Sequence, residues 1–270
     1  MILTRHQTRH GPRWARDGRY LPAALDLSAL LALPRDSLVQ LLETLPPGAP
    51  AEGEALPPID PGQEVWACGV TYQRSRDARQ AESKVGDIYQ RVYDAQRPEV
   101  FFKSTGWRVQ GHTMPIHIRA DSHWNVPEPE MVIVANAHDD IVGYTAGNEM
   151  SSRDIEGENP LYLPQAKVYN RSCALGPAIV LAGADSLRDL PIHLTITRNN
   201  AVAFQGSART SQMKRKVEEL VACLQSELAF PSGVLLMTGT CVVPPDSFSL
   251  LPGDVVKVGV GELTLENEAD

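Results

Sequence analysis

The 270-residue sequence lacks an excess of basic residues, any long apolar run and any closely spaced pair of cysteines. Its 25 Lys and Arg residues are outnumbered by 33 Asp and Glu, which gives a formal net charge of −8 at pH 7. A nucleic-acid partner is not expected, because no broad basic surface is available to contact phosphates. No run approaches the length that crosses a bilayer, and the N-terminus lacks the apolar core of a secretory signal. We therefore expect a cytoplasmic protein with no membrane partner.

The four cysteines, Cys68, Cys173, Cys223 and Cys241, lie far apart in the sequence and form no CxxC pair. Neither a zinc knuckle nor a disulfide framework is indicated, so we expect reduced thiols in the core. The N-terminal TRHQTRHG contains two histidines four residues apart. Without neighbouring acids or helix signals, it is not expected to bind a metal.

The first sixty residues differ in sequence pattern from the rest of the chain. They contain one short amphipathic helix, expected over residues 36–45, with Asp36 as the N-cap and four leucines on one face. Six prolines between residues 46 and 61 then favour an extended connector. We predict a small N-terminal domain with its proline-rich linker over residues 1–60 and a second domain over residues 61–270.

The sequence of the second domain is typical of strands and turns. Apolar, β-branched runs predict strands at 64–70, 131–134, 141–145, 178–182, 192–197, 234–237 and 255–260. One amphipathic helix is expected between Thr210 and Phe230, where apolar residues recur at intervals of three and four. Another helix, expected over 77–93, is so polar that it suits a mobile lid better than a packed core element.

Three glutamates, Glu128, Glu130 and Glu149, occur where the surrounding pattern predicts a buried sheet. In VPEPEMVIV, Glu128 and Glu130 share one face of an extended strand, since residues i and i+2 point the same way. The two neighbouring prolines remove ladder donors, which places this segment at a sheet edge or strand end. A return strand after a turn near residue 139 brings Glu149 opposite position 129 or 130, so the three acids meet.

An isolated pair of glutamates two residues apart lies most often on a solvated sheet edge, where the carboxylates need no partner. Three carboxylates gathered on one face repel, which raises at least one pKa and lowers stability unless a cation lies between them. Oxygen donors without cysteine or histidine suit a hard cation such as Mg²⁺, Mn²⁺ or Ca²⁺ and fit zinc poorly. The three acids therefore predict a divalent-metal site.

Five stretches resemble the fumarylacetoacetate hydrolase superfamily in order and approximate spacing: VPEPE, GYTAGNEMSSRDIE, PQAKVYNRSCALGPAIV, LMTGT and LLPGDVVKVGVGELTLEN. The resemblance covers about residues 64 to 270. It implies an α+β fold, a mostly antiparallel β-roll with a few peripheral helices, assembled as a homo-oligomer, either a dimer or a tetramer. It also implies that Glu128, Glu130 and Glu149 hold a metal, commonly Mg²⁺, although the superfamily more usually has aspartate at the last position.

The same resemblance implies which residues surround the metal. Lys167, in PQAKVYN, matches the active-site lysine; buried beside a cation it would have a lowered pKa and could take a proton. The alternative is a lysine at a solvated strand end, where lysines usually lie. The TGT turn would offer amides and a hydroxyl to a substrate carboxylate, or simply end a strand. The residues implied to bind substrate are Tyr72, Arg74, Lys103, Thr238, Gly239 and Thr240.

Members of the superfamily act on 2-keto acids, and the stretch WACGVTYQRSRDAR indicates which reaction to expect. The hydrolases resemble one another in a G-x-N-Y-x-x-H-x-x-E run, whose histidine and glutamate activate water. Counting from Gly69, this chain keeps Tyr72 but has Ser75 and Ala78 in place of that dyad. Neither side chain is a general base at neutral pH, so hydrolysis is disfavoured.

Glu99, in VYDAQRPEVFFKSTGW, comes directly before an apolar strand. This stretch and its neighbours look most like the 2-keto-3-deoxy-D-arabinonate dehydratase branch, which implies that Glu99 is a catalytic acid or base. Burial against the phenylalanines would raise its pKa, which suits protonation of a departing hydroxyl. The alternative is a structural carboxylate paired with Arg97 or Lys103.

The expected activity is that of a hydro-lyase in sugar-acid catabolism, converting a small-molecule 2-keto acid, a 2-keto-3-deoxypentonate, to 2-oxoglutarate semialdehyde. Either Lys167 or Glu99 would remove the proton from C3. An acylpyruvate hydrolase and an oxaloacetate-type decarboxylase remain open as alternatives, since a decarboxylase needs no water-activating dyad. A metal-stabilised β-roll that only binds a partner is a further alternative.

Overall fold

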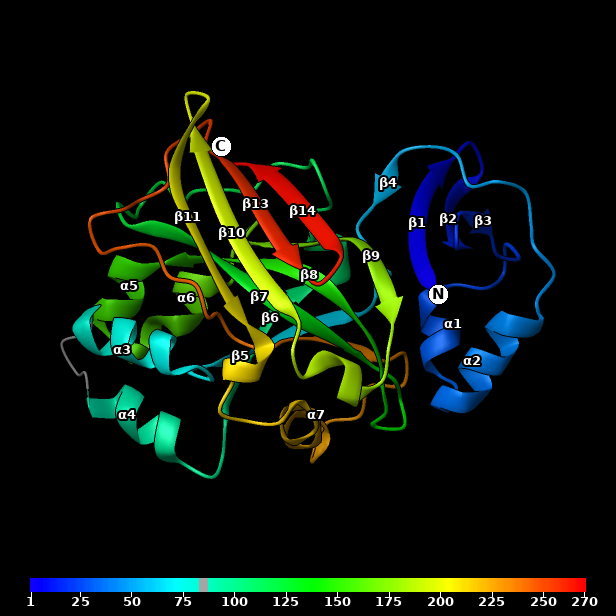
Figure 1. The fold of residues 1–270 in the computed structure, drawn as a ribbon, viewed down its shortest axis with the longest axis horizontal. Coiled ribbons are helices and arrows are strands. Elements are labelled where there is room, and N and C mark those ends of the chain that lie inside the picture. The colour runs from blue at the N-terminus through cyan, green and yellow to red at the C-terminus, as the bar shows by residue number, and fades with distance from the viewer. Residues whose placement is uncertain (83–86) are drawn as a thin grey trace.

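The computed structural model describes residues 1–82 and 87–270 (Figure 1). Its strands are β1 Ile2–Thr8, β2 Gly11–Arg16, β3 Arg19–Tyr20, β4 Ala55–Leu56, β5 Glu64–Gly69, β6 Glu99–Thr105, β7 Asn125–Ala135, β8 Ile141–Ser152, β9 Cys173–Leu181, β10 Pro191–Arg198, β11 Ala201–Arg209, β12 Val234–Met237, β13 Val255–Val260 and β14 Leu263–Glu268. The helices are α1 Leu27–Leu31, α2 Arg35–Thr44, α3 Gln73–Glu82, α4 Asp87–Asp94, α5 Arg153–Glu158, α6 Leu163–Lys167 and α7 Val217–Gln225. Short 3₁₀ turns cover Gly106–Arg108, Pro160–Tyr162, Ala184–Leu187 and Thr210–Gln212.

The strands form two sheets. The larger has ten strands in the order β3-β2-β1-β9-β8-β7-β12-β5-β6, with β4 paired to β1, and the smaller has the order β11-β10-β13-β14. Within both sheets, every pairing of these strands is antiparallel except that of β12 with β5. This confirms the expected α+β fold with a mostly antiparallel β-roll. No helix among the described residues is long and apolar enough to cross a bilayer.

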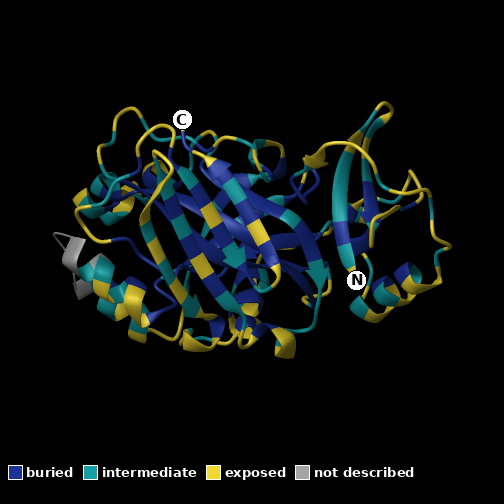
Figure 2. Ribbon diagram, turned by 45° about the horizontal axis from the view of Figure 1, so that its top comes forward, coloured by how far each residue is buried: buried dark blue, intermediate teal, exposed yellow. Residues whose placement is uncertain are grey.

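Two apolar cores cover opposite faces of the large sheet. Figure 2 shows that its central strands are mostly buried. In β7, Met131, Ile133 and Ala135 face the core beneath the small sheet and α7, while Val132 and Val134 face the core beneath α1 and α2. This alternation follows from the period-2 geometry of a strand. Because Glu128 and Glu130 have even numbers in the same strand, they lie on the same face as Val132 and Val134, nearer the start of β7. Glu149 joins them on that face because it lies directly opposite Glu128 on β8.

The expected strands of the second domain are confirmed, and most extend beyond the apolar runs that predicted them. The helix expected between Thr210 and Phe230 is confirmed only as α7, since a 3₁₀ turn precedes it and Leu228 beyond it is 44% exposed. The polar segment 77–93 overlaps α3 and α4, and residues 83–86 lie outside the described part. Its role as a lid stays a prediction.

The N-terminal residues depart from expectation in two ways. Asp36 is not the N-cap of α2, because the helix begins one residue earlier, after Pro34, and Asp36 lies in its first turn, where a negative charge favours the helix dipole. Strands β1 to β3 were not expected, and they continue the large sheet through the pairing of Ile2 with Val180. Residues 1–60 also share a core with Val65 and Val132. The domain boundary at residue 60 stays a prediction.

All four cysteines are free thiols, as expected, and three of them, Cys68, Cys173 and Cys241, are buried. Cys223, on α7, is half-buried.

Candidate active site

The hairpin of β7 and β8 brings the three glutamates together. Glu128 lies directly opposite Glu149, and Glu130 opposite Gly147. The expected register, with Glu149 opposite residue 129 or 130, was wrong by one or two positions because the hairpin turns around residue 138, where Ala135 pairs with Ile141, and not around residue 139. A β-bulge after Val134 offsets this shift by one residue. The proline-containing segment was expected at a sheet edge or strand end. Strand β12 pairs only with residues 132–135 of β7, so the half of β7 that contains the prolines has a neighbouring strand on one side only.

The three carboxyl groups are buried, not solvated. Glu128, Glu130 and Glu149 are 2%, 0% and 2% exposed, and one oxygen from each lies within 4.8 Å of the others. Burial, and then the neighbouring carboxylates, raises the pKa of Glu130 well above its ordinary value. Burial also raises the pKa of Glu149, although Lys167 and Lys103 oppose the shift. This is a cluster that binds either protons or a cation.

The oxygen atoms of the cluster fit a hard divalent cation. Oε1 of Glu130 and Oε1 of Glu149 are buried and accept no hydrogen bond from any described group. Buried acceptors of this kind are costly unless a donor or a metal ion satisfies them. Carboxylate oxygens are also the ligands that Mg²⁺ prefers. The residues present therefore match the divalent-metal site predicted from the sequence.

Lys167 completes the cluster from the last residue of α6. Its Nζ donates to Oε2 of Glu128 at 2.6 Å and to Oε2 of Glu149 at 2.9 Å, and its side chain is 2% exposed. The lysine is therefore part of the buried site, and the alternative of a solvated strand end is wrong for its position.

Two further buried cations support the glutamates from behind. Lys103, on β6, is 0% exposed; it donates to the carbonyls of Met150 at 3.0 Å and Lys167 at 2.5 Å, and its Nζ lies 3.7 Å from Oε1 of Glu149. Burial lowers the pKa of Lys103, and Glu149 partly opposes this. Arg153, at the start of α5, donates to Oε1 of Glu128 at 2.9 Å.

A small cavity of about 20 Å³ opens beside the acids. Glu99 reaches it from the first residue of β6, and its carboxylate occupies the space that the missing side chain of Gly69 leaves, because a Cβ there would lie 1.9 Å from Oε2 of Glu99. Glu99 is half-buried. The other residues that line this cavity are Cys68, Gly69, Val70, Ser75, Phe101, Glu128, Glu130, Glu156, Leu163, Lys167, Gly239 and Thr240.

The TGT turn supports the acids more directly than expected. The N–H of Gly239 donates to Oε2 of Glu130 at 2.7 Å, and Thr238 Oγ1 donates to the Met131 carbonyl at 2.8 Å. Gly239 has φ +94° and lies against Oγ1 of Thr71, so only glycine fits there. Thr240 lines the cavity, with its hydroxyl 3.2 Å from the Val242 carbonyl.

Tyr72 and Arg74 line a neighbouring cavity of about 520 Å³. Tyr72 is 1% exposed, and its hydroxyl has no hydrogen-bond partner among the described residues. Arg74 is exposed and makes a long contact of 3.4 Å to the Val243 carbonyl. Ser75, in the place of the dyad histidine, donates to the Tyr72 carbonyl at 2.8 Å.

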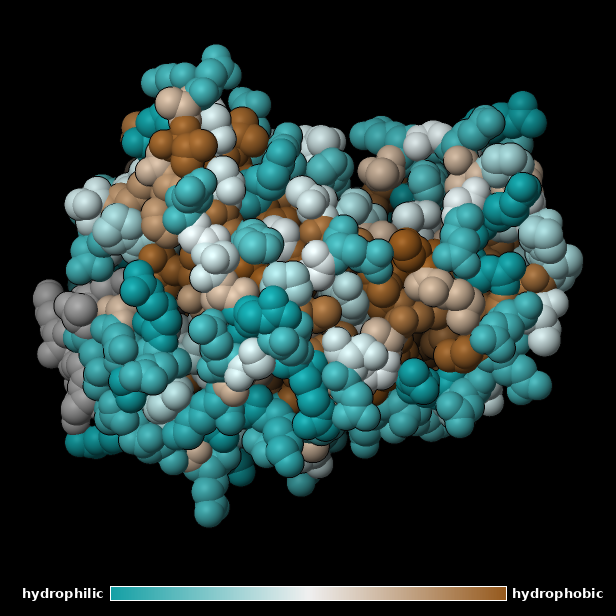
Figure 3. All heavy atoms as spheres, viewed as in Figure 1, coloured by the Kyte–Doolittle hydropathy of each residue, from teal (hydrophilic) through white to brown (hydrophobic). Residues whose placement is uncertain are grey.

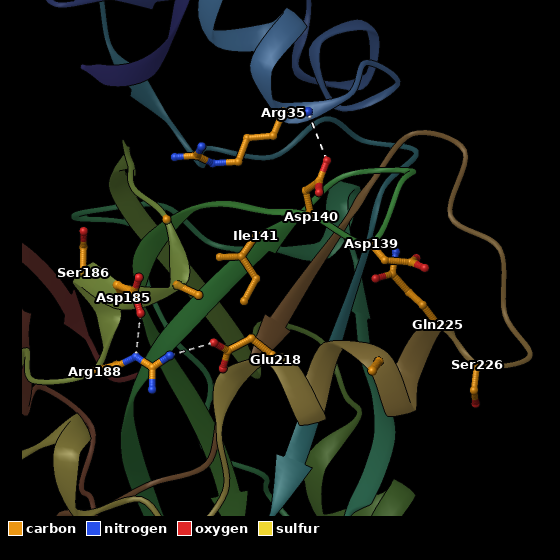
Figure 4. Close-up of a pocket in the computed structure, with 13 residues that line it drawn as sticks. Arg35, Asp139, Asp140, Ile141, Asp185, Ser186, Arg188, Glu218, Gln225 and Ser226 are labelled. Atoms are coloured by element: carbon orange, nitrogen blue, oxygen red, sulfur yellow. Dashed lines mark hydrogen bonds and ion pairs between the residues drawn. The ribbon is translucent and has the colours of Figure 1, made fainter.

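A larger cavity, about 990 Å³, lies elsewhere, between Arg35, the turn at Asp139 and Asp140, and α7 (Figure 4). Among its charged groups, Arg188 contacts both Asp185 and Glu218. Because it contains none of the clustered glutamates, its size alone does not make it the reactive site.

Two functional candidates were not predicted from the sequence. Arg153 and Glu156 lie on α5; the first bonds to Glu128, and the second is 5% exposed and lines the small cavity. Both belong to the motif GYTAGNEMSSRDIE, which was the available signal. Only the packing of α5 on β7 and β8 reveals their direction.

Fold and site together define a β-roll protein with a buried three-carboxylate site for a divalent cation. The chain belongs to the fumarylacetoacetate hydrolase family, since the family model "Fumarylacetoacetate (FAA) hydrolase C-terminal" matches residues 64–268.

Similar proteins include two named as sugar-acid dehydratases. A probable 2-keto-3-deoxyxylonate dehydratase of Haloferax volcanii is 43% identical over 249 residues, covering 88% of this chain and 86% of the relative. A 2-dehydro-3-deoxy-D-arabinonate dehydratase of Saccharolobus solfataricus is 42% identical over 214 residues, covering 76% and 70%. A solved 2-keto-3-deoxy-D-arabinonate dehydratase complexed with magnesium and 2,5-dioxopentanoate superposes with a TM-score of 0.83 at 34% identity, covering 100% of this chain and 99% of that one.

Proposed function

We propose that this protein is a divalent-metal-dependent dehydratase, a hydro-lyase that converts a 2-keto-3-deoxypentonate to 2-oxoglutarate semialdehyde, which is 2,5-dioxopentanoate. One observation carries the proposal: Glu99 lines the same cavity as the glutamate cluster and Lys167, while Ser75 replaces the water-activating histidine. The similarity to the two named dehydratases, each of which the chain matches over more than two thirds of its length, supports the substrate class.

Glu128, Glu130 and Glu149 would hold the cation, with Mg²⁺ favoured and Mn²⁺ or Ca²⁺ compatible with the same oxygen donors. Bound there, the cation would act as a Lewis acid that polarises the 2-keto acid and makes its C3 hydrogens acidic. Gly239 fixes the direction of the Glu130 carboxylate, and Arg153 that of Glu128. Lys103 fixes the backbone at Met150 and Lys167, so we assign it a positioning role behind the cluster in place of direct substrate binding.

Proton transfer falls to Glu99. Lys167 pairs with the carboxylates of Glu128 and Glu149, which favours its ammonium form, and an ammonium has no lone pair to accept a proton. The Glu99 carboxylate would remove a proton from C3 and return it to the hydroxyl at C4, which leaves as water. Two later proton shifts turn the remaining C5 hydroxyl into the aldehyde of the product. A single residue acting on adjacent carbons requires elimination from one side of the substrate.

The substrate exceeds the present cavity. A pentonate does not fit in about 20 Å³, so substrate binding requires the walls of the cavity to separate. Ser75 on α3 and Glu156 on α5 form part of these walls, and the two helices contact each other. Ser75 precedes the 77–93 segment in the same helix, and the predicted role of that segment in covering the site is kept as part of the proposal.

Homo-oligomeric assembly and a cytoplasmic location are further parts of the proposal. The choice among stereoisomers of the sugar acid falls to Tyr72, Arg74 and Thr240, whose side chains lie around the two adjoining cavities. We propose these three as contacts to the substrate hydroxyl groups.

The experiment that tests the function incubates the Mg²⁺-loaded protein with a panel of 2-keto-3-deoxy sugar acids, acylpyruvates and oxaloacetate. Semialdehyde, pyruvate and CO₂ are followed separately. Semialdehyde from a 2-keto-3-deoxypentonate is the expected product. Pyruvate released from an acylpyruvate, or CO₂ from oxaloacetate, without any semialdehyde would replace the dehydratase assignment by a hydrolase or a decarboxylase.

A further inference from the structure

Helix α5, Arg153–Glu158, carries a buried acid to the small cavity. Glu156 is 5% exposed and lines the cavity of about 20 Å³ together with Glu99 and Lys167. Among the described residues of this cavity, Glu156 is the acid that neither the metal cluster nor the proton transfer between C3 and C4 uses. Glutamate side chains are rarely buried this deeply. In a reactive cavity, a titratable side chain of this kind is a candidate general acid or base.

The buried residues of α5 share one face of the helix. Arg153 and Glu156 are three residues apart, and side chains at this spacing lie on the same face. Arg153 donates to Oε1 of Glu128 at 2.9 Å, so this face is turned toward the metal cluster. By contrast, Glu158 on the same helix is exposed. The helix geometry therefore directs Glu156 toward the cluster.

A hydrogen bond places the Glu156 carboxylate over the strand that carries Glu149. Ser151 Oγ donates to Oε2 of Glu156 at 3.1 Å. Ser151 lies two residues beyond Glu149 on β8, so the two side chains point to the same face, about 7 Å apart along the strand. In a substrate whose 2-keto end lies at the glutamates, C5 lies about 4 Å beyond C2, at about 1.5 Å per bond. The position of Glu156 therefore suits the C5 end of the substrate.

Glu99 and Glu156 enter the cavity from different sides. One part of the large sheet has the strand order β8-β7-β12-β5-β6. Glu99 belongs to β6 and lies against Gly69 of β5. Glu156 belongs to α5, which packs on β7 and β8 at the other end of this order. A substrate between the two acids meets Glu99 on one side and Glu156 on the other. The water that Glu99 helps to release departs on the Glu99 side, so Glu156 keeps its access to the carbon chain.

The surrounding helices separate Glu156 from solvent. Helix α5 contacts α3 and α6, and the three helices lie at the same end of the β-roll (Figure 1). Figure 3 shows mostly hydrophilic side chains on the surface over α3 and α4. Glu156 is thus buried behind a hydrophilic outer surface. A closed site limits the loss of protons to bulk water, so a proton taken up by this carboxylate is available to return to the substrate.

We propose that Glu156 is a second acid–base residue, which carries the later proton shifts of the reaction. This inference rests on the proposed function, and it begins where the Glu99 step ends. The product of that step is a 2-keto acid with a double bond between C3 and C4 and a hydroxyl on C5. The Glu156 carboxylate removes a proton from C5. The electron pair of that bond forms a C4–C5 double bond, the C3–C4 pair moves to C2–C3, and the negative charge moves to the keto oxygen.

Glu156 then delivers the same proton to C3. This restores the keto group at C2 and leaves an enol at C4 and C5. Transfer of the enol hydroxyl proton to C4 gives the aldehyde. Both shifts are isomerisations, so no oxidant, reductant or additional proton is needed. One carboxylate can serve both carbons, because C3 and C5 are only about 2.5 Å apart across two bonds of about 1.5 Å.

The test compares the Mg²⁺-loaded wild type and Glu156→Gln on a 2-keto-3-deoxypentonate. The unsaturated 2-keto acid is followed by its near-ultraviolet absorbance and its vinyl protons in NMR, and the semialdehyde is followed separately. Glutamine keeps the shape and an acceptor for Ser151 but does not act as a base. Glu156→Gln is expected to remove water from the substrate at close to the wild-type rate. It should form the semialdehyde at least about 100-fold more slowly, so that the unsaturated acid accumulates.

Glu158→Gln is the matched control, because it removes an exposed carboxylate from the same helix. It should keep both rates. Thermal unfolding and calorimetric titration of Mg²⁺ report whether each variant keeps the fold and the metal site. Glu156→Asp retains a carboxylate set back by one methylene, and it should form the semialdehyde faster than Glu156→Gln. A purely structural side chain would not show this rescue.

Two results overturn the inference while the proposed function stands. One is semialdehyde formed by Glu156→Gln at the wild-type rate. The other is an equal loss of water release and semialdehyde formation in Glu156→Gln and Glu156→Asp, which would place Glu156 in the first step or in the structure. A wild type that removes no water from any 2-keto-3-deoxypentonate contradicts the proposed function itself, and the inference fails with it.

Discussion

Substitution of Glu130 separates metal binding from folding. Glu130 is 0% exposed, forms no ion pair with a described residue, and accepts its one bond from the N–H of Gly239. Its pKa is raised well above 4.5, first by burial and then by the charges of Glu149 and Glu128. Without a cation this side chain destabilises the fold at neutral pH, whether it is protonated or ionised.

The size of this destabilisation can be calculated for the protonated and for the ionised side chain. Holding a carboxyl group protonated at pH 7 against an ordinary pKa of 4.5 costs about 3.4 kcal/mol, at about 1.4 kcal/mol per unit. An ionised group within 4.8 Å of one other carboxylate is destabilised by about 3.5 kcal/mol at an effective dielectric constant of 20. Glu130→Gln keeps the shape and the acceptor for Gly239 but removes the charge. We expect the metal-free variant to be more stable than the metal-free wild type by up to about 3 kcal/mol at pH 7.

The assay is urea unfolding in chelator and in excess Mg²⁺, together with calorimetric titration of Mg²⁺. The wild type should gain stability from Mg²⁺, and Glu130→Gln should gain little, since a ligand charge is lost. Glu266→Gln is the control, because Glu266 forms only a surface ion pair with Lys257, worth less than about 1 kcal/mol. The reasoning is refuted if Glu130→Gln is less stable than the wild type in chelator, or if both gain equally from Mg²⁺.

Three further predictions concern the same site. Glu99→Gln should lower the dehydration rate by roughly 10²- to 10⁴-fold while Mg²⁺ binding by calorimetry is unchanged; parallel loss of Mg²⁺ binding would contradict a role in proton transfer. Lys103→Met should lower kcat with KM unchanged, because Lys103 lies behind the cluster. A rise in KM alone would instead support the direct contact with substrate that the sequence predicted. Because burial raises the pKa values of Glu130 and Glu149, the folded metal-free protein retains protons that the unfolded chain releases above about pH 4.5. Its unfolding free energy should therefore fall as pH rises from 5 to 8, and a rise over that interval would oppose this cause.

The cluster was predictable from the sequence because its geometry is local. Residues two apart on a strand share a face, and a hairpin brings its own two strands together, so Glu128, Glu130 and Glu149 had to meet. The exact partner of Glu149 was not predictable, since no sequence pattern marks the turn centre at residue 138 or the bulge after Val134. The motifs around Lys167 and Glu99 supplied the remaining members through resemblance.

Features that depend on contacts between residues far apart in the sequence could not be predicted. Strand β1 reads as a polar N-terminal segment, yet it forms a hairpin with β2 and joins the large sheet by pairing Ile2 and Leu3 with β9, more than 160 residues later. Arg153 and Lys103 carry charges that the sequence alone places at the surface, where such residues mostly occur. Their burial depends on carboxylates and carbonyls supplied by other elements.

The measurement closest to the central claim follows a 2-keto-3-deoxypentonate by NMR in D₂O with the Mg²⁺-loaded protein. The account predicts 2-oxoglutarate semialdehyde with deuterium introduced during the reaction, in the wild type but not in Glu99→Gln. Cleavage between C3 and C4 to pyruvate, or semialdehyde formed at the wild-type rate by Glu99→Gln, would contradict it.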